Sequence, residues 1–340
     1  MRQCLVGYTP IAQGPSMTQS EPTILHRRQG RIARITLNRP RALNALTPDM
    51  IMALSAALAG YQDDPAVHAV VVEGAGKAFC AGGDVRAVRD AVLAGQHDLV
   101  EQFFEAEYAL NLAIARYPKP YVALVGGTCM GGGIGLSVHG SARVASDHAV
   151  FAMPEAAIGL FADVGATYAL PRLRGASGMW MALTGARVSG ADAVFLGLAT
   201  HYVPSEALPL LADALAVNGV AALVDHAVPP PPGPAAFAMD QMQCFAAPSV
   251  PAILSRLKAL GTPWAQEALQ QIAAASPAAI LRTFSALRDG EGYRLEQALE
   301  AELVLTRTAT RHPDFAEGVR AMLVDKDRSP RWADAPLVPA

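Results

Sequence analysis

Short apolar runs that open into glycine-rich stretches characterise the first half of the chain. Residues 31–37 alternate polar with β-branched or aliphatic side chains, which predicts a strand that ends before Pro40. Residues 67–72 form a valine-rich run that is too short for a helix, and Tyr121–Val125 forms another. Both runs predict buried strands, and the glycines that follow them indicate that these strands end in loops.

Segments with helical periodicity lie between these strands and after them. Ile51, Leu54 and Leu58 share one face, and Thr47-Pro48 is typical of a helix start. Because Gly60 is typical of a helix end, we expect a helix over 47–59. Further helices are expected from near Asp84, over roughly residues 98–116, and around Leu295, Ala298, Leu299 and Leu303.

This order of strands, glycine turns and helices predicts an α/β fold. We expect a poorly ordered N-terminal extension over 1–23, with Met17 as an alternative start, and a core over 24–205. Residues 206–340 should be mostly helical, with a proline-rich loop at 228–234. Four consecutive prolines make that loop a linker, a surface loop or a docked partner motif.

Composition excludes several classes of protein. Of 340 residues, 52% are hydrophobic, and the formal charge of -3 offers no general attraction for nucleic acid. The uncharged run at 120–142 holds seven glycines, which predicts a strand, a turn and a helix start rather than a membrane span. The four cysteines are widely spaced, so no metal site or disulfide framework is predicted. Without a recognisable targeting signal, we expect a cytoplasmic protein.

The glycine-rich loops do not match phosphate-binding motifs. Residues 131–135 do not complete GxGxxG, and 74–78 lack the flanking residues of a P-loop. A nucleophile elbow around Ser137 fails because His139 stands where glycine is required. Two loops, 80–84 and 130–133, could instead present backbone N–H groups to a ligand oxygen, as in an oxyanion hole. Tight turns alone are the alternative.

The motifs around these loops resemble the crotonase (enoyl-CoA hydratase/isomerase) superfamily, and most of all its 3-hydroxyisobutyryl-CoA hydrolase branch. The resemblance covers roughly residues 24–333 and rests on Lys77–Val85, Gly127–Gly140, Phe151–Glu155, Ala157–Gly165, Leu170–Leu173, Leu183–Gly185, Ala199–Val203, His312–Ala321 and Asp325–Trp332.

This resemblance implies a spiral of ββα units with a helical C-terminal region, and an acyl-CoA thioester lying across the two loops. The amides of Gly83 and Gly132 match the oxyanion-hole positions. Arg41 and Ala42 match the segment along the nucleotide end of CoA. Ala81, Asp84 and Glu107 are further candidate contacts. The resemblance implies no cofactor beyond the CoA of the substrate and no metal, and it makes a homo-oligomer possible.

Carboxylates decide which reaction is expected. The first glutamate of hydratases in this superfamily is replaced here by Gly135, which cannot exchange protons. Glu155 matches the second carboxylate and is assigned the central catalytic role, with a solvated loop residue as the alternative. Asp163 matches an aspartate of the hydrolase branch that would bind the 3-hydroxyl of the substrate, with a helix N-cap as the alternative. Ala162 and Ala166-Thr167 depart from the pattern of that branch.

We therefore expect hydrolysis of 3-hydroxyisobutyryl-CoA to CoA and 3-hydroxyisobutyrate, a step of valine catabolism. An enoyl-CoA hydratase or isomerase, and a non-catalytic acyl-CoA-binding protein, are the alternatives. The sequence leaves open the acyl group, the oligomeric state, and the choice between an anhydride intermediate and direct attack of water.

Overall fold

The computed structural model describes residues 21–337. The expected N-terminal extension over 1–23 therefore lies almost wholly outside the described residues, as do Met17 and Cys4. The described chain begins with three residues that lead into the first strand.

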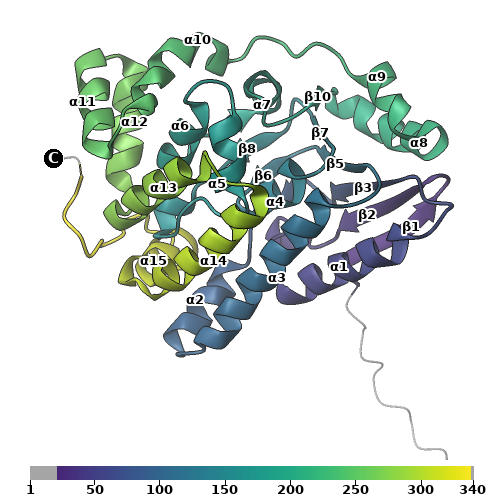
Figure 1. Ribbon diagram of the computed structural model, residues 1–340, viewed down its shortest axis with the longest axis horizontal. Coiled ribbons are helices and arrows are strands. Elements are labelled where there is room, and N and C mark those ends of the chain that lie inside the picture. The colour runs from purple at the N-terminus through teal and green to yellow at the C-terminus, as the bar shows by residue number, and fades with distance from the viewer. Residues whose placement is uncertain (1–20, 338–340) are drawn as a thin grey trace, which may run out of the picture.

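Two sheets form the centre of the molecule (Figure 1). The larger has six strands in the order β1-β2-β3-β5-β7-β10: Ile24–Gln29, Ile32–Leu37, Ala69–Gly74, Tyr121–Val125, Ala142–Ala145 and His201–Tyr202. The smaller has four in the order β4-β6-β8-β9: Ala78–Cys80, Thr128–Met130, Val150–Ala152 and Val188–Ser189. Neighbours are parallel except for the antiparallel pairs β1–β2 and β8–β9.

From β3 to β8, consecutive strands alternate between the two sheets. In each of the pairs β3/β4, β5/β6 and β7/β8, the first strand joins the larger sheet and the second joins the smaller one. A helical element follows each pair: α2 (Val85–Leu93), α4 (Gly132–Val138) and the 3-10 turn η2 (Glu155–Ile158). The expected spiral of ββα units is therefore confirmed.

The remaining helices pack on the sheets or on one another. They are α1 Pro48–Gln62, α3 His97–Ala115, α5 Ala166–Ala169, α6 Ser177–Thr184, α7 Gly190–Leu196, α8 Leu208–Asn218, α9 Ala222–His226, α10 Pro234–Met242, α11 Val250–Leu260, α12 Pro263–Ala274, α13 Pro277–Gly290, α14 Leu295–Arg311 and α15 Pro313–Val319. Short 3-10 turns lie at Pro40–Ala42 (η1), Leu170–Arg172 (η3), Ser205–Ala207 (η4), Gly219–Ala221 (η5) and Gln243–Ala246 (η6), and a π-helical turn lies at Arg320–Val324 (η7).

The inner strands of the larger sheet are buried on both faces, whereas the edge strand β1 is mostly exposed. In β5, Tyr121, Ala123 and Val125 join the main core, whereas Val122 and Leu124 join a second cluster that α8 and α9 cover. This alternation is the period of a strand whose two faces are both covered, and it explains why the sequence of β5 is apolar throughout.

Sequence signals at helix ends agree with the structure except at Gly60. Thr47 caps α1 through its side chain, as expected, but the helix continues to Gln62. Gly60 therefore lies inside the helix, which corrects the predicted end. A glycine in a helix costs only about 1 kcal/mol, and Tyr61 packs against the main core, so the helix continues for two more residues.

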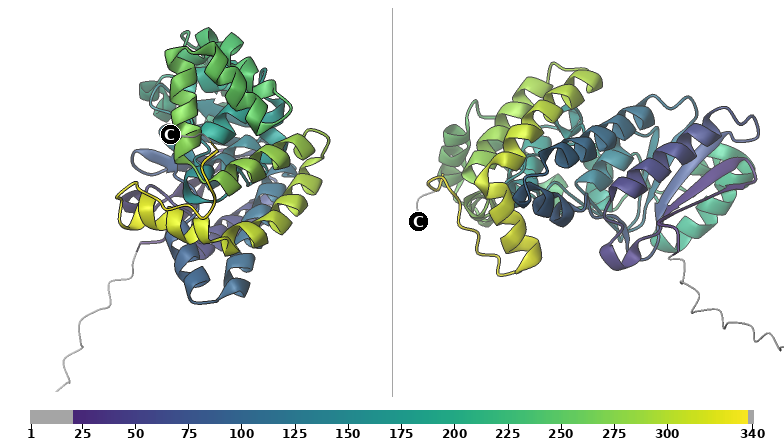
Figure 2. Two further views of the ribbon diagram at one scale, coloured as in Figure 1. Left: turned by 90° about the vertical axis from the view of Figure 1, so that its left-hand side faces the viewer. Right: turned by 90° about the horizontal axis from the view of Figure 1, so that it is seen from below.

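The C-terminal region is mostly helical and packs against the N-terminal part of the chain. Figures 1 and 2 show α14 beside α3, with α15 below it near α2. The main core is continuous from Ile24 in β1 to Val319 in α15. Residues 227–233, with the four prolines, link α9 to α10 without a regular element. The boundary at residue 205 stays a prediction.

One helical stretch, Ser205–His226, is apolar and long enough to cross a membrane by length and composition alone, with a mean hydropathy of 1.9 and 33% of it buried. It consists of η4, α8, η5 and α9, and Gly219 interrupts it at φ 64°. Leu211 and Leu215 pack against the larger sheet, so the stretch covers that sheet. The absence of a membrane partner stays a prediction.

Gly133 sits where α4 crosses β4, and a Cβ on it would lie 2.2 Å from the carbonyl oxygen of Cys80. We expect Gly133→Ala to lower the free energy of unfolding by roughly 1–3 kcal/mol, because backbone must move to make room. Gly60→Ala is the matched control, since nothing lies within 4 Å of its Cβ position. It should raise that free energy by about 0.5–1 kcal/mol. Urea unfolding measures both, and equal effects of the two changes would contradict this account of Gly133.

Candidate active site

Two unpaired backbone amides lie together where strands of the smaller sheet end. β4 and β6 are parallel neighbours, so the loops that follow them leave the same edge of the sheet. The amide nitrogen of Gly83 lies 3.4 Å from the position that a Cβ on Gly132 would take. Among the described residues, neither the Gly83 nor the Gly132 amide donates a hydrogen bond. Both N–H groups are therefore free to bind a ligand.

The segment 39–46 fixes the first of these loops. Leu46 donates its amide to Gly82 O at 2.8 Å and accepts from the Asp84 amide at 2.8 Å. The Arg39 guanidinium lies 2.9 Å from the Asp84 carboxylate. Asn44, at φ 57°, donates its side-chain amide to the carbonyl of Ala78 at 2.8 Å. This network sets the direction in which the Gly83 amide points.

A cavity of about 300 Å³ opens beside the two amides. Six of the residues singled out from the sequence line it: Ala81, Gly83, Glu107, Gly132, Glu155 and Asp163. Arg41, Ala42 and Asp84 do not. Arg41 is exposed on η1, and Asp84 caps α2 through its side chain. The roles assigned to all nine residues stay predictions.

Glu155 enters the cavity from the start of η2, directly after β8 and Met153-Pro154. It is 6% exposed, and its Oε2 atom has no hydrogen-bond partner among the described residues. Its Oε1 atom lies 2.8 Å from the Cβ position of Gly131, so the carboxyl group reaches the second glycine loop. The alternative that Glu155 is a solvated loop residue is therefore wrong.

Glu107 reaches the same loop from α3. Its Oε1 atom is buried without a partner and lies 2.3 Å from the Cβ position of Gly132. Any side chain at 132 would displace this carboxyl group. Glycine is therefore required at 132 for close approach as well as for its free amide.

Asp163 also lines the cavity, is 4% exposed, and lies three residues before Ala166, the first residue of α5. Tyr108 of α3 donates its hydroxyl to Asp163 Oδ2 at 2.7 Å. The residue at the N-cap of α5 is Gly165, and no side chain caps that helix locally. The N-cap alternative for the Asp163 side chain is thus wrong.

These three acids interact electrostatically. Burial, and after it the charge of Asp163, raises the pKa of Glu107 and of Glu155 well above the usual range. Burial raises the pKa of Asp163 to about 6, although the hydrogen bond from Tyr108 lowers it. A raised pKa makes the ionised carboxylate a stronger base, which suits proton transfer close to neutral pH.

Position 135 has no room for a second glutamate. A Cβ on Gly135 would lie 2.8 Å from Asn111 Nδ2 and 2.8 Å from Val164 Cβ. Asn111 is fully buried, and neither of its side-chain polar atoms has a partner among the described residues. The carboxylate that hydratases place here is therefore excluded by packing as well as absent from the sequence.

Sequence reasoning missed several residues of this site. Asn111 follows Glu107 by one helical turn, so the two form a polar pair on the otherwise apolar face of α3. That pair could have indicated from the sequence that Asn111 lies near the site. Glu302 likewise interrupts the apolar face of α14. Phe103 and Phe104 form an apolar wall. Met322 and Leu323 reach the cavity from η7 with no local signal in the sequence.

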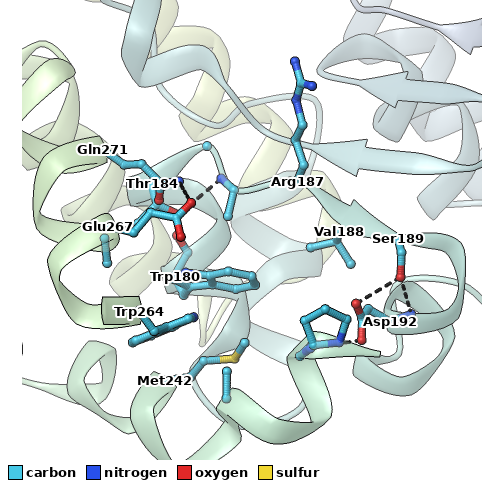
Figure 3. Close-up of a pocket in the computed structure, with 16 residues that line it drawn as sticks. Trp180, Thr184, Arg187, Val188, Ser189, Asp192, Met242, Trp264, Glu267 and Gln271 are labelled. Carbon is cyan, nitrogen blue, oxygen red and sulfur yellow. Dashed lines mark hydrogen bonds between the residues drawn. The ribbon is translucent and has the colours of Figure 1, made fainter. Parts of the chain in front are cut away.

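A larger cavity of about 590 Å³ lies between α6, α7, α10 and α12 (Figure 3). It contains none of the predicted site residues. Trp180 and Trp264 face each other at 6.0 Å, and Asp192 accepts hydrogen bonds from Ser189 Oγ and the Ala235 amide. Because its buried carboxylate is already satisfied, this cavity lacks the unpaired groups that mark the smaller one.

The smaller cavity can stabilise negative charge on an oxygen and transfer protons next to it. The two free amides are of the type that does the first, and carboxyl groups are of the type that does the second. Within residues 21–337, no group of three or more His, Cys, Asp or Glu side chains is arranged to hold a metal ion.

Comparisons with known proteins match nearly the whole chain. A family model described as enoyl-CoA hydratase/isomerase matches residues 32–338. The mitochondrial 3-hydroxyisobutyryl-CoA hydrolase of Xenopus tropicalis is 45% identical over 312 residues, which is 88% of this chain and 81% of the relative. The human protein of that name is 42% identical over 334 residues, 94% of this chain and 86% of the relative.

Solved structures share the fold across nearly the whole chain. An enoyl-CoA hydratase from Rhodobacter sphaeroides superposes with a TM-score of 0.87 at 42% identity, covering 92% of this chain and 93% of that one. A carnitinyl-CoA dehydratase from Mycobacterium thermoresistibile superposes with a TM-score of 0.86 at 39% identity, covering 91% of each chain.

The hydrogen bond from Tyr108 lowers the pKa of Asp163. We expect Tyr108→Phe to raise the pKa of Asp163 above its value of about 6, because the lost hydroxyl stabilises the ionised form. Carboxyl ¹³C NMR titration measures this pKa. Tyr117→Phe is the control, because Tyr117 donates to Leu58 O on α1 and should leave Asp163 unchanged. A pKa that stays the same or falls in Tyr108→Phe would contradict the assigned contact.

Proposed function

The chain belongs to the enoyl-CoA hydratase/isomerase family, and from that membership together with the site we propose that it is a thioester hydrolase acting on 3-hydroxyisobutyryl-CoA. The products are CoA and 3-hydroxyisobutyrate. The observation that carries the proposal is the pair of free amides, Gly83 and Gly132, beside a buried Glu155 and an Asp163 held by Tyr108. Curated relatives at 42–45% identity have this hydrolase name.

The two amides act on the thioester carbonyl. Its oxygen would accept from Gly83 N–H and Gly132 N–H, and both bonds strengthen as negative charge develops on that oxygen. One such donor typically contributes roughly 10²–10³ in rate. Among the described residues, the amides of Gly83 and Gly132 have no other acceptor. They are therefore in place to bind the oxygen before the reaction begins.

Glu155 drives the attack on the carbonyl carbon. In one route its carboxylate takes a proton from water, the water oxygen bonds to the carbon, and the C–S bond breaks to release CoA thiolate. In the other route its own oxygen attacks, thiolate leaves, and water then hydrolyses the anhydride. Both routes need an ionised Glu155, whose basicity its burial increases.

Asp163 recognises the acyl group. As an ionised acceptor it would bind the 3-hydroxyl of the substrate, while Tyr108 occupies Oδ2 and keeps the carboxyl group in place. A site built to bind a hydroxyl discriminates strongly against an analogue without one, because the buried carboxylate then loses a partner.

The wider setting of the reaction is part of the proposal. We propose that the reaction, which forms 3-hydroxyisobutyrate, is a step of valine catabolism. Cytoplasmic location, a homo-oligomeric state and the lack of a cofactor other than CoA remain predictions from the sequence. The relatives named above are mitochondrial proteins by name.

Thiol release from 3-hydroxyisobutyryl-CoA, followed with a thiol reagent, tests the proposal. Glu155→Gln should lower kcat by roughly 10²–10⁴, the usual contribution of an acid/base group. Asp163→Asn should lower kcat/KM by about tenfold or more. Glu105→Gln, an exposed acid on the same helix as Glu107, is the control and should have no effect. Release by the unmodified protein no faster than in buffer would reject the hydrolase.

Glu107 favours a second candidate function, hydration of an enoyl-CoA. It brings a second carboxyl group to the cavity from α3, although position 135 is closed to one. If the hydrolase proposal is right, crotonyl-CoA should lose its enoyl absorbance far more slowly than 3-hydroxyisobutyryl-CoA releases thiol. Faster hydration than hydrolysis would reverse the assignment.

A further inference from the structure

The Asp163 loop, residues 161–165, has an unfavourable backbone. Val164 adopts φ 56°, in the left-handed region that β-branched residues rarely enter. Its side chain is buried against the cavity, and Gly165 follows at φ 79°. Such strain persists only where surrounding groups enforce it, and it concentrates at functional sites. Two side chains from distant elements enforce it here.

His139 holds the loop from the C-terminal end of α4. Its Nε2–H donates to the Val164 carbonyl at 2.8 Å, and a Cβ on Gly165 would lie 2.5 Å from its ring. Burial lowers the pKa of His139 to about 4, so the ring is neutral and can keep this donor at neutral pH. His139 is the residue that breaks the nucleophile-elbow pattern, and the proposed reaction does not use it.

Glu302 holds the other side of the strained residue from α14. Its carboxylate accepts from the Gly165 amide at 2.7 Å, the Thr167 amide at 3.0 Å and Thr167 Oγ1 at 2.5 Å. It is 2% exposed, and no Lys or Arg among the described residues pairs with it. Burying a carboxylate without a counter-ion is unfavourable. Gly165 is the N-cap residue of α5, and a side chain there would collide with the His139 ring. The amides at the start of α5 are therefore bound by Glu302 and not by a residue next to the helix.

One turn further along α14, Thr306 lies 3.0 Å from the Tyr108 hydroxyl that binds Asp163. Residues 302 and 306 share a face of the helix. α14 therefore contacts both the backbone that follows Asp163 and the tyrosine that holds its carboxyl group. These contacts leave the Asp163 carboxylate little freedom.

We infer that Glu302 and His139 are positioning residues that hold the Asp163 loop in its strained form and so give the site its preference for hydroxylated acyl-CoA esters. The inference rests on the proposed hydrolase. It assigns a role in substrate selection to α14, which touches no part of the cavity itself.

The test compares two substrates, 3-hydroxyisobutyryl-CoA and isobutyryl-CoA, which differ by the hydroxyl. Glu302→Gln puts an amide N–H against backbone N–H groups, so the loop should relax. We expect the ratio of the two kcat/KM values to fall about tenfold or more, with most of the loss on the hydroxylated substrate. His139→Phe, which removes the donor and keeps a ring, should act in the same direction.

Asp192→Asn is the matched control. Like Glu302, Asp192 is buried and accepts hydrogen bonds from a hydroxyl and from backbone, although from one amide where Glu302 accepts from two, and it faces the larger cavity. It should lower stability without changing the ratio. If Glu302→Gln does not fold, Thr306→Val provides the same readout by removing one hydroxyl. In an Asp163→Asn background, Glu302→Gln should leave the ratio unchanged.

If Glu302→Gln lowers kcat/KM equally for both substrates, Glu302 has only a structural role and the inference is overturned. An unmodified protein that hydrolyses the two esters equally well would also overturn it. If the unmodified protein hydrolyses neither ester, the proposed function fails instead, and the two failures are therefore distinguishable.

Discussion

The carboxyl groups of Glu107, Glu155 and Asp163 are buried around one small cavity, and no cation among the described residues pairs with them. Each would be more stable in water, so the surrounding structure has to hold them there. The buried polar side chains leave no room for a Cβ at positions 131, 132 and 135, where it would lie within 3 Å of a polar side-chain atom. The glycine-rich motif thus reflects the space that these acids and Asn111 need.

The strand arrangement follows from the same requirement. The amides of Gly83 and Gly132 lie together because β4 and β6 end side by side in the smaller sheet, while β5, which lies between them in the sequence, joins the larger sheet. Segment 39–46 then fixes the first loop, and α14 fixes the loop of Asp163. The candidate catalytic groups on loops are thus held by elements far away in the sequence.

Much of this was predictable from sequence, and the exceptions have physical causes. β5 and α3 could be placed to within a residue, because apolar period and flanking prolines act locally. Gly60 was misread because packing of Tyr61 outweighs a weak propensity. Glu302 sat on a readable apolar face, whereas Met322 and Leu323 enter the cavity through a turn whose position only tertiary packing determines.

The wall of the cavity is contributed by residues that range from Ala81 to Leu323. During synthesis, the N-terminal ββα units can leave the ribosome and pair while the last wall residues are still untranslated. The nascent chain therefore carries an apolar, acid-lined hollow open to water until η7 emerges. The site is complete only once η7 has packed against it, so a chain without η7 has no closed chamber in which to cleave a metabolite.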